Sequence, residues 1–234
     1  MITFVEEPDG PLRVWQEPEP GRLYVVGADV AEGLEHGDYS CAQVLDVASG
    51  AQVAMWHGHV EADLFGDVLY DLGWWYNGAL VGVEQNNHGL TTITRLRQLE
   101  YPRIYRHRTV DQVTKKVTVK FGWPTNRQTK PLMIDTLNAA LREGEVTVYD
   151  KRTIYELRTF VRDELGRMSG SPFDDCVMAL AIAVMMFPYA TQASEVENPQ
   201  APRWSGAWWK EQAALASKQS KRVPIGYYNR RRAS

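Results

Sequence analysis

The chain has 234 residues, 44% hydrophobic and 24% charged, which is enough for one full hydrophobic core. Its two cysteines, Cys41 and Cys176, lie in apolar stretches, which argues against a disulfide framework and for a reducing compartment. The acidic N-terminus is unlike a signal peptide, and the longest apolar stretch, Cys176 to Phe187, is too short to span a bilayer, so we expect neither secretion nor membrane insertion.

The net charge of −3 is unevenly distributed along the sequence. Residues 103–130 carry a local charge of +7, and so do residues 201–234, so the remainder carries −17. An acidic body with two basic segments suits a protein that binds metal at one place and a polyanion at others. The alternative is ordinary solvated surface charge, which is more plausible for residues 201–234 than for residues 103–130.

Hydrophobic periodicity predicts a mixed α/β body in which three closely connected strands form an antiparallel meander and a later, nearly all-apolar strand is covered on both faces. In chain order, the sequence predicts strands at 22–29, 39–47 and 51–57, a helix at 61–76, a strand at 79–84, a helix at 88–99, a short strand at 103–105, a basic hairpin or ribbon at 110–121, a helix at 126–142, a strand at 146–149, and helices at 152–163 and 174–189.

Composition changes at both ends of this body. Residues 1–20 are rich in proline and glycine and are predicted to be a linker or docking segment. Residues 21–190 form the predicted ordered domain, and residues 191–234 are predicted to be a flexible basic tail.

Acidic residues lie at the edges of three apolar segments. Asp29 and Glu84 each end a predicted strand, and the pair Asp174 and Asp175 opens the last predicted helix. Converging carboxylates repel one another unless cations neutralise them, and hard oxygen ligands favour magnesium or manganese over zinc. The alternatives are a turn-forming role for Asp29, an ordinary ion pair for Glu84, and helix capping by one residue of the pair.

Basic and polar residues near these acids are candidates for DNA contact. Lysines in the predicted ribbon would follow the phosphate backbone rather than read bases, and a lysine at a helix start would face phosphate together with the helix N–H groups. The loop after Glu84 is either a phosphate contact or an ordinary helix entry. The candidates are Lys115, Lys116, Lys120, Arg127, Lys130, Asn87 and His88.

The order of these elements and acids resembles the RNase H-like nuclease superfamily, and within it the nuclease domain of phage large terminase subunits. The resemblance covers about 170 residues and rests on the following motifs: Gly27-Ala28-Asp29, Asp38-Tyr39-Ser40, Val83-Glu84-Gln85-Asn86-Asn87-His88-Gly89, Thr129-Lys130-Pro131, and Phe173-Asp174-Asp175-Cys176 with the apolar run that follows.

The resemblance implies an RNase H-like mixed central sheet, antiparallel meander plus parallel strands, flanked by helices and carrying a basic β-hairpin. It also implies an endodeoxyribonuclease that uses two Mg²⁺ or Mn²⁺ ions to cleave double-stranded viral DNA concatemers during genome packaging. Asp29 would bridge both ions, Glu84 would be a ligand, and Asp175 matches the family's ligand better than Asp174, which stays an added ligand or neighbouring acid.

Large terminases join this domain to an ATP-driven motor, but the sequence contains no G-x-x-x-x-G-K-[ST] motif, so ATP hydrolysis is not expected of this chain. The implied partners are double-stranded DNA, the terminase ATPase domain, the portal and the small terminase subunit, in the host cell cytoplasm. Three alternatives stay open: another RNase H-like enzyme such as a junction resolvase or an integrase-type strand transferase, a sugar-kinase or actin-like nucleotide-binding half, and a catalytically silent DNA-binding or assembly module.

Overall fold

The computed structural model describes residues 7, 9–32, 39–110, 114–162, 168–170 and 172–193. The predicted basic tail therefore lies outside the described residues, apart from its first three positions. All of the described helices and strands belong to one unit, Pro11–Ala193. In this part of the chain, no helix is long and apolar enough to cross a membrane.

The described residues form fourteen elements, whose bounds agree with most of the ranges predicted from periodicity. They are β1 (Leu12–Val14), β2 (Tyr24–Asp29), β3 (Ser40–Asp46), β4 (Gln52–Gly58), α1 (Ala62–Trp75), β5 (Leu80–Val83), α2 (Asn87–Gln98), β6 (Arg106–Val110), β7 (Val117–Phe121), α3 (Thr129–Glu143), α4 (Lys151–Thr159), β8 (Val161–Arg162), β9 (Met168–Ser169) and α5 (Asp175–Ala193).

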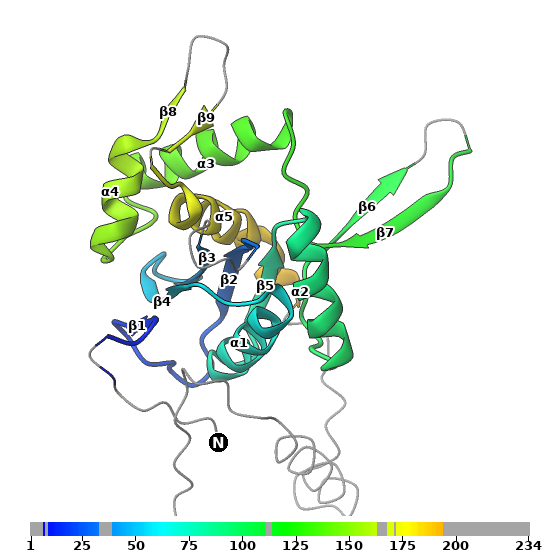
Figure 1. The fold of residues 1–234 in the computed structure, drawn as a ribbon, viewed down its shortest axis with the longest axis horizontal. Coiled ribbons are helices and arrows are strands. Elements are labelled where there is room, and N and C mark those ends of the chain that lie inside the picture. Colours follow the sequence, from blue (N-terminus) through cyan, green and yellow to red (C-terminus); the bar gives the residue numbers. More distant parts are fainter. Residues whose placement is uncertain are drawn as a thin grey trace, which may run out of the picture. The chain divides into compact units, whose positions relative to one another are not determined.

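A mixed five-stranded sheet with the order β1-β4-β3-β2-β5 forms the centre of the fold (Figure 1). Strands β2, β3 and β4 make the predicted antiparallel meander, and β1 adds to its edge by pairing antiparallel with β4. Strand β5 lies parallel to β2, which places the C-terminal ends of these two strands at the same edge of the sheet. The predicted mixed sheet is confirmed.

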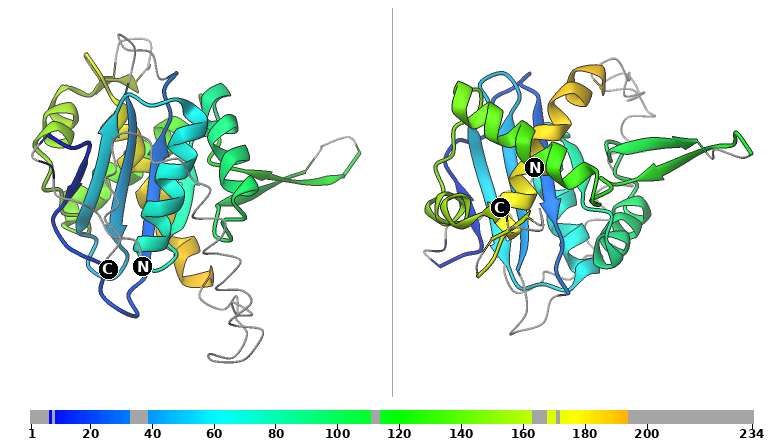
Figure 2. Two further views of the ribbon diagram at one scale, coloured as in Figure 1. Left: turned by 60° about the horizontal axis from the view of Figure 1, so that its bottom comes forward. Right: turned by 90° about the horizontal axis from the view of Figure 1, so that it is seen from above.

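Helices cover both faces of the sheet (Figure 2). Helix α5 packs on β2, β3 and β5, and α3 and α4 pack on α5, whereas α1 lies on the opposite face against β2 and β5 with α2 beside it. Burial on both sides explains why β3 is buried along its whole length and why β5 is apolar throughout.

Helix α5 lies unusually close to β2 at Gly27. A Cβ atom at this position would collide with the carbonyl oxygen of Ala179 and the backbone nitrogen of Ala183. Only a residue without a side chain permits this approach. Because α5 runs from this contact toward its first residue, Asp175, the close packing fixes where the helix begins relative to the end of β2.

The predicted basic hairpin is present as β6 and β7, which project away from the sheet (Figure 1). Its base joins the sheet beside the end of β5, because the N–H of Trp123 donates to Val83 (2.7 Å) and the N–H of Gln85 donates to Trp123 (2.7 Å). The hairpin therefore leads from the exposed basic turn directly to the residues next to Glu84.

Several local predictions were wrong. Residues 146–149 form no strand: their one ladder contact is an isolated bridge between Thr147 and Ala51. Residues 103–105 similarly contribute a bridge between Ile104 and Val81. The helix predicted from residue 126 begins at Thr129, since the side chain of Asn126 accepts N–H groups in the preceding turn.

The helix predicted to run to residue 163 ends at Thr159 and is followed by β8 and β9, which periodicity did not indicate. Strand β1 falls in the segment predicted to be a linker or docking segment.

Candidate metal centre

Two of the predicted acidic residues meet at one edge of the sheet. Asp29 is the last residue of β2, and Glu84 follows the last residue of β5. The N–H of Glu84 donates to the carbonyl oxygen of Ala28 (2.9 Å), so the two acids leave adjacent strands at the same level. Because β2 and β5 pair in parallel, these two acids are neighbours although they lie 55 positions apart in the sequence.

Asp175 approaches the same edge from α5. Its Oδ2 accepts the N–H of Tyr39 (3.3 Å), and Tyr39 immediately precedes β3, whose second residue, Cys41, pairs with Asp29. The start of α5 is thus tied to the sheet next to Asp29. Asp175 is 6% exposed, so its carboxylate has little water to stabilise a charge.

Electrostatics shows that the three other acids act on Asp29. Asp29 as a residue keeps partial solvent contact. The pKa of its carboxyl is nevertheless well above the ordinary value, mainly because the carboxyl is buried and next because the charge of Glu84 is close to it. The charges of Asp175 and Asp174 raise the pKa of Asp29 further. These residues fit a divalent cation, because the ligand atoms are oxygens and their mutual repulsion is relieved by positive charge.

Asn86 orients Glu84, a role that the sequence interpretation missed. Its Nδ2 donates to Oε2 of Glu84 (2.7 Å) and to the carbonyl oxygen of Val30 (3.2 Å), while its Oδ1 caps α2 by accepting the N–H of Gly89 (2.7 Å). The sequence carried a signal for Asn86 as a helix cap, because asparagine is common just before a helix and its side chain accepts an N–H of the first turn. Of the residues predicted in this loop as DNA contacts, Asn87 is exposed and His88 is half-buried in the first turn of α2.

Lys130 lies beside the acidic cluster. Its Nζ is 3.3 Å from Oδ2 of Asp174, and each of these side chains is 27% exposed. It also lies over the ring of Phe160, at 5.8 Å from the centroid. The lysine predicted to face phosphate therefore balances the charge of one of the acids.

The other predicted DNA-contact residues are exposed and separate from the acids. Lys115 and Lys116 lie in the turn of the hairpin, and Lys120 lies on β7 opposite His107. Arg127 is exposed in the turn before α3. The structure thus gathers the acids at the sheet edge and spreads these basic residues along the hairpin and its base.

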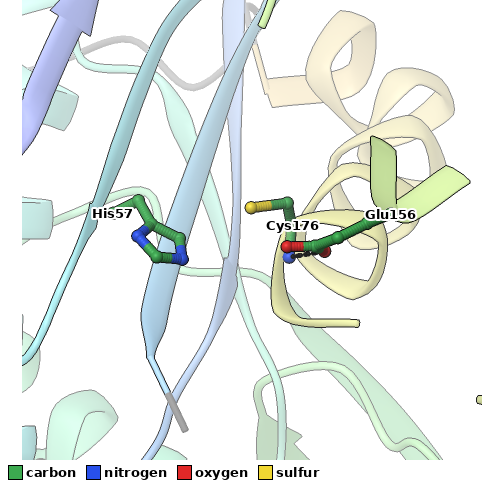
Figure 3. Close-up of side chains that lie close together, drawn as sticks. All are labelled: His57, Glu156 and Cys176. Atoms are coloured by element: carbon green, nitrogen blue, oxygen red, sulfur yellow. Dashed lines mark hydrogen bonds between the residues drawn. The ribbon is translucent and has the colours of Figure 1, made fainter. Parts of the chain in front are cut away.

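A second cluster, which the sequence interpretation did not identify, brings together His57 of β4, Glu156 of α4 and Cys176 of α5 (Figure 3). Each offers one ligand-type atom, and these atoms lie within 4.8 Å of one another. The guanidinium of Arg152 contacts the ring of His57, and burial followed by this charge lowers the pKa of His57 to about 3. Since Arg152 repels a cation and Glu156 already accepts two backbone N–H groups, these contacts account for the cluster without a metal.

Comparison with known proteins gives a structural likeness only. No protein-family model matches the chain, and no curated protein matches it. The large terminase nuclease of thermophilic phage G20c, solved with bound magnesium, has a TM-score of 0.61 and 24% identity, and covers 79% of this chain and 92% of that chain. The Thermus phage P74-26 large terminase nuclease domain has a TM-score of 0.57 and 24% identity, covering 80% and 90%.

The chain therefore has the RNase H-like fold of phage large terminase nuclease domains, as the resemblance in its sequence implied. The G20c nuclease has also been solved with bound cobalt and with bound zinc.

Proposed function

We propose that this chain is a metal-dependent endonuclease that cleaves double-stranded viral DNA concatemers during genome packaging. The observation that carries the proposal is the convergence of Asp29, Glu84 and Asp175, with Asp174 beside them, at one edge of the sheet. The likeness to terminase nucleases, one of them solved with magnesium, supports the same reading.

Each acid has a distinct place in this proposal. The charges of all three other acids act on Asp29, which would hold both of two Mg²⁺ or Mn²⁺ ions, while Glu84 and Asp175 would each hold one. Bound ions of this kind activate a water for in-line attack on the phosphate and stabilise the departing 3′ oxygen. Asn86 keeps Oε2 of Glu84 in a fixed direction, and the N–H of Tyr39 does the same for Asp175.

The basic residues would hold the DNA. Lys115, Lys116 and Lys120 would follow the phosphate backbone along the hairpin, and Arg127 would extend this contact toward the sheet. Lys130 would exchange its contact with Asp174 for a phosphate when a cation takes over the charge of that acid.

Asn87 and His88, in the first turn of α2, would contact phosphates next to the cleaved one. We infer that the chain acts in the host cell cytoplasm and that its partners are the terminase ATPase domain, the portal and the small terminase subunit. The proposed domain limits are 21–190 for the nuclease, with a linker or docking segment before it and a flexible basic tail after it.

Plasmid cleavage in Mg²⁺ or Mn²⁺ tests the proposal. EDTA and each of Asp29→Ala, Glu84→Ala and Asp175→Ala should reduce cleavage by at least about 100-fold, because the loss of a ligand removes the ions that carry the chemistry. Asp135→Ala, which removes an exposed acid outside the cluster, should cleave like the wild type.

Cleavage that survives all three substitutions would overturn the assignment of the site. A branched DNA substrate in the same assay separates the packaging role from a junction resolvase, which would cut the branched DNA in preference to the linear one. Calorimetry with manganese identifies a catalytically silent module, which would bind no metal at these acids.

A further inference from the structure

We call the four acids Asp29, Glu84, Asp174 and Asp175 the acidic centre. We propose that Glu156 is a positioning residue of this centre: it caps α5 from α4, so that the carboxylate of Asp174 is not drawn into capping the helix and can face a cation. The inference rests on the proposed function for its consequence, but the capping itself is visible in the structure. Glu156 is a buried acid that has no other role in the proposed chemistry.

Glu156 reaches the first turn of α5 from a neighbouring helix. The residue is 4% exposed, and its Oε2 accepts the N–H of Cys176 (2.8 Å) and of Val177 (3.3 Å). Figure 3 shows the carboxylate of Glu156 hydrogen-bonded to the backbone of Cys176. These N–H groups belong to the second and third residues of α5, which have no partner within their own helix.

Such N–H groups are ordinarily satisfied by the side chain of the residue just before the helix. In α5 that residue is Asp174, whose carbonyl oxygen accepts the N–H of Met178 (2.9 Å) and so begins the helix. Its carboxylate points elsewhere, because Oδ2 lies 3.3 Å from Nζ of Lys130. Glu156 thus does the capping that Asp174 would otherwise do.

The carboxylate of Glu156 also carries the negative charge that the positive end of a helix dipole favours. If Glu156 were absent, Asp174, as the residue just before the helix, could supply both the acceptor and the charge. Turning toward the helix would take its carboxylate away from Lys130 and from Asp29. The acidic centre would then lose one of its members without any substitution in it.

Helix α4 is held firmly enough to act as a support. Its start is capped by Asp150, whose Oδ2 accepts the N–H of Thr153 (2.7 Å). The side chain of Gln43 on β3 donates both to Oγ1 of Thr153 (3.0 Å) and to the carbonyl oxygen of Cys176 (3.3 Å). The first turn of α5 is therefore fixed through the sheet and through α4 at once.

Manganese titration calorimetry on the full chain tests the inference with Glu156→Ala and Glu156→Gln. The alanine variant should bind Mn²⁺ roughly 10–100-fold more weakly, the range typical of residues that orient metal ligands. The glutamine variant keeps an oxygen that accepts the two N–H groups and should recover most of the affinity. Glu143→Ala removes an exposed glutamate at the end of α3 and should bind Mn²⁺ like the wild type.

A thermal unfolding cycle gives a second readout that also serves if Glu156→Ala is too unstable for calorimetry. In the wild-type background Asp174 does not cap α5, so Asp174→Ala should change the melting temperature little. In the Glu156→Ala background we expect Asp174 to take over the cap, so the same substitution should lower the melting temperature more. The same loss in both backgrounds would overturn the inference, as would wild-type Mn²⁺ affinity in Glu156→Ala. By contrast, a wild-type protein that binds Mn²⁺ but cuts no DNA would refute only the nuclease proposal.

Discussion

At the scale of single residues, the acidic centre is costly to the protein that carries it. The pKa of Asp29 is raised because its carboxyl is buried and faces other acids, which means that the folded state disfavours its ionised form. A residue retained at such a cost is typical of a functional site. The cost should disappear when a cation is bound.

Asp29→Asn should therefore stabilise the metal-free protein. The pKa of Asp29 in the folded state is above its unfolded value of about 3.9. The stability that Asp29 contributes to the folded state is therefore fully present below pH ~4 and is lost as the pH rises through the folded pKa. In EDTA, the melting temperature of Asp29→Asn should exceed that of the wild type at pH 7 by several degrees, since about 1 kcal/mol corresponds to roughly 2–4 °C in a chain of this size. The difference should shrink toward pH ~4.

Manganese should reverse the order, raising the melting temperature of the wild type more than that of Asp29→Asn. Asp135→Asn, at an exposed ion pair on α3, is the matched control and should show neither effect. Equal melting temperatures of wild type and Asp29→Asn at every pH in EDTA would mean that Asp29 carries no such cost.

The residues of the centre differ in how far sequence reveals them. Asp29 and Glu84 could be predicted because strand ends and apolar runs are local patterns. Glu156 could not, since its contact with α5 joins two helices that periodicity does not place side by side. The contact of Asn86 with Glu84 is local, but a helix-cap pattern does not tell that the amide of Asn86 also reaches back to Glu84. Asp174 shows the same limit: the pattern suggested that one acid of the pair caps the helix, whereas Glu156 takes that role.

At the scale of elements, the position of α5 on the sheet decides whether the acids meet. Strand and helix ranges followed from hydrophobic period, but the close contact at Gly27 did not, because a glycine in a strand pattern has several meanings. The misread segment 146–149 had the composition of a strand but forms only an isolated bridge in place of a ladder. Periodicity identifies apolar segments and does not tell whether a backbone partner is available.

Gly27→Ala should disturb both stability and metal binding. The added methyl group has no room between β2 and α5, and overpacking of this kind costs about 1–3 kcal/mol. Urea unfolding should show this loss, and Mn²⁺ affinity should fall because Asp175 moves with the helix.

Gly144→Ala is the matched control, because Gly144 ends α3 with a φ of 73° and a methyl group added there would meet no other atom within 4 Å. Backbone strain there should cost about 1 kcal/mol and leave Mn²⁺ affinity unchanged. If both variants bound Mn²⁺ like the wild type, the α5 contact would not control the centre.

At the scale of the whole molecule, opposite charges are separated along one path. The acids lie at the sheet edge, and the hairpin carries exposed lysines away from it, with its base joined to the residues beside Glu84. The ring of Phe121 at that base is covered by Arg97 of α2, at 4.9 Å from the centroid. A polyanion held by the hairpin would thus be led toward the acids, where the proposed cations would bridge the like charges.

Replacing Lys115, Lys116 and Lys120 together by alanine should weaken binding to linear double-stranded DNA and reduce its salt dependence. Each phosphate contact contributes about 0.9 to the slope of log K against log salt, so the loss of three contacts should lower the slope by up to about 2.7. The KM for cleavage should rise while kcat stays near the wild-type value, because these side chains hold DNA without touching the acids. A triple alanine variant at Arg142, Lys151 and Arg158, exposed on α3 and α4, removes the same charge and should keep the wild-type slope. Equal slopes for the two triple variants would show that net charge, and not the hairpin, holds the DNA.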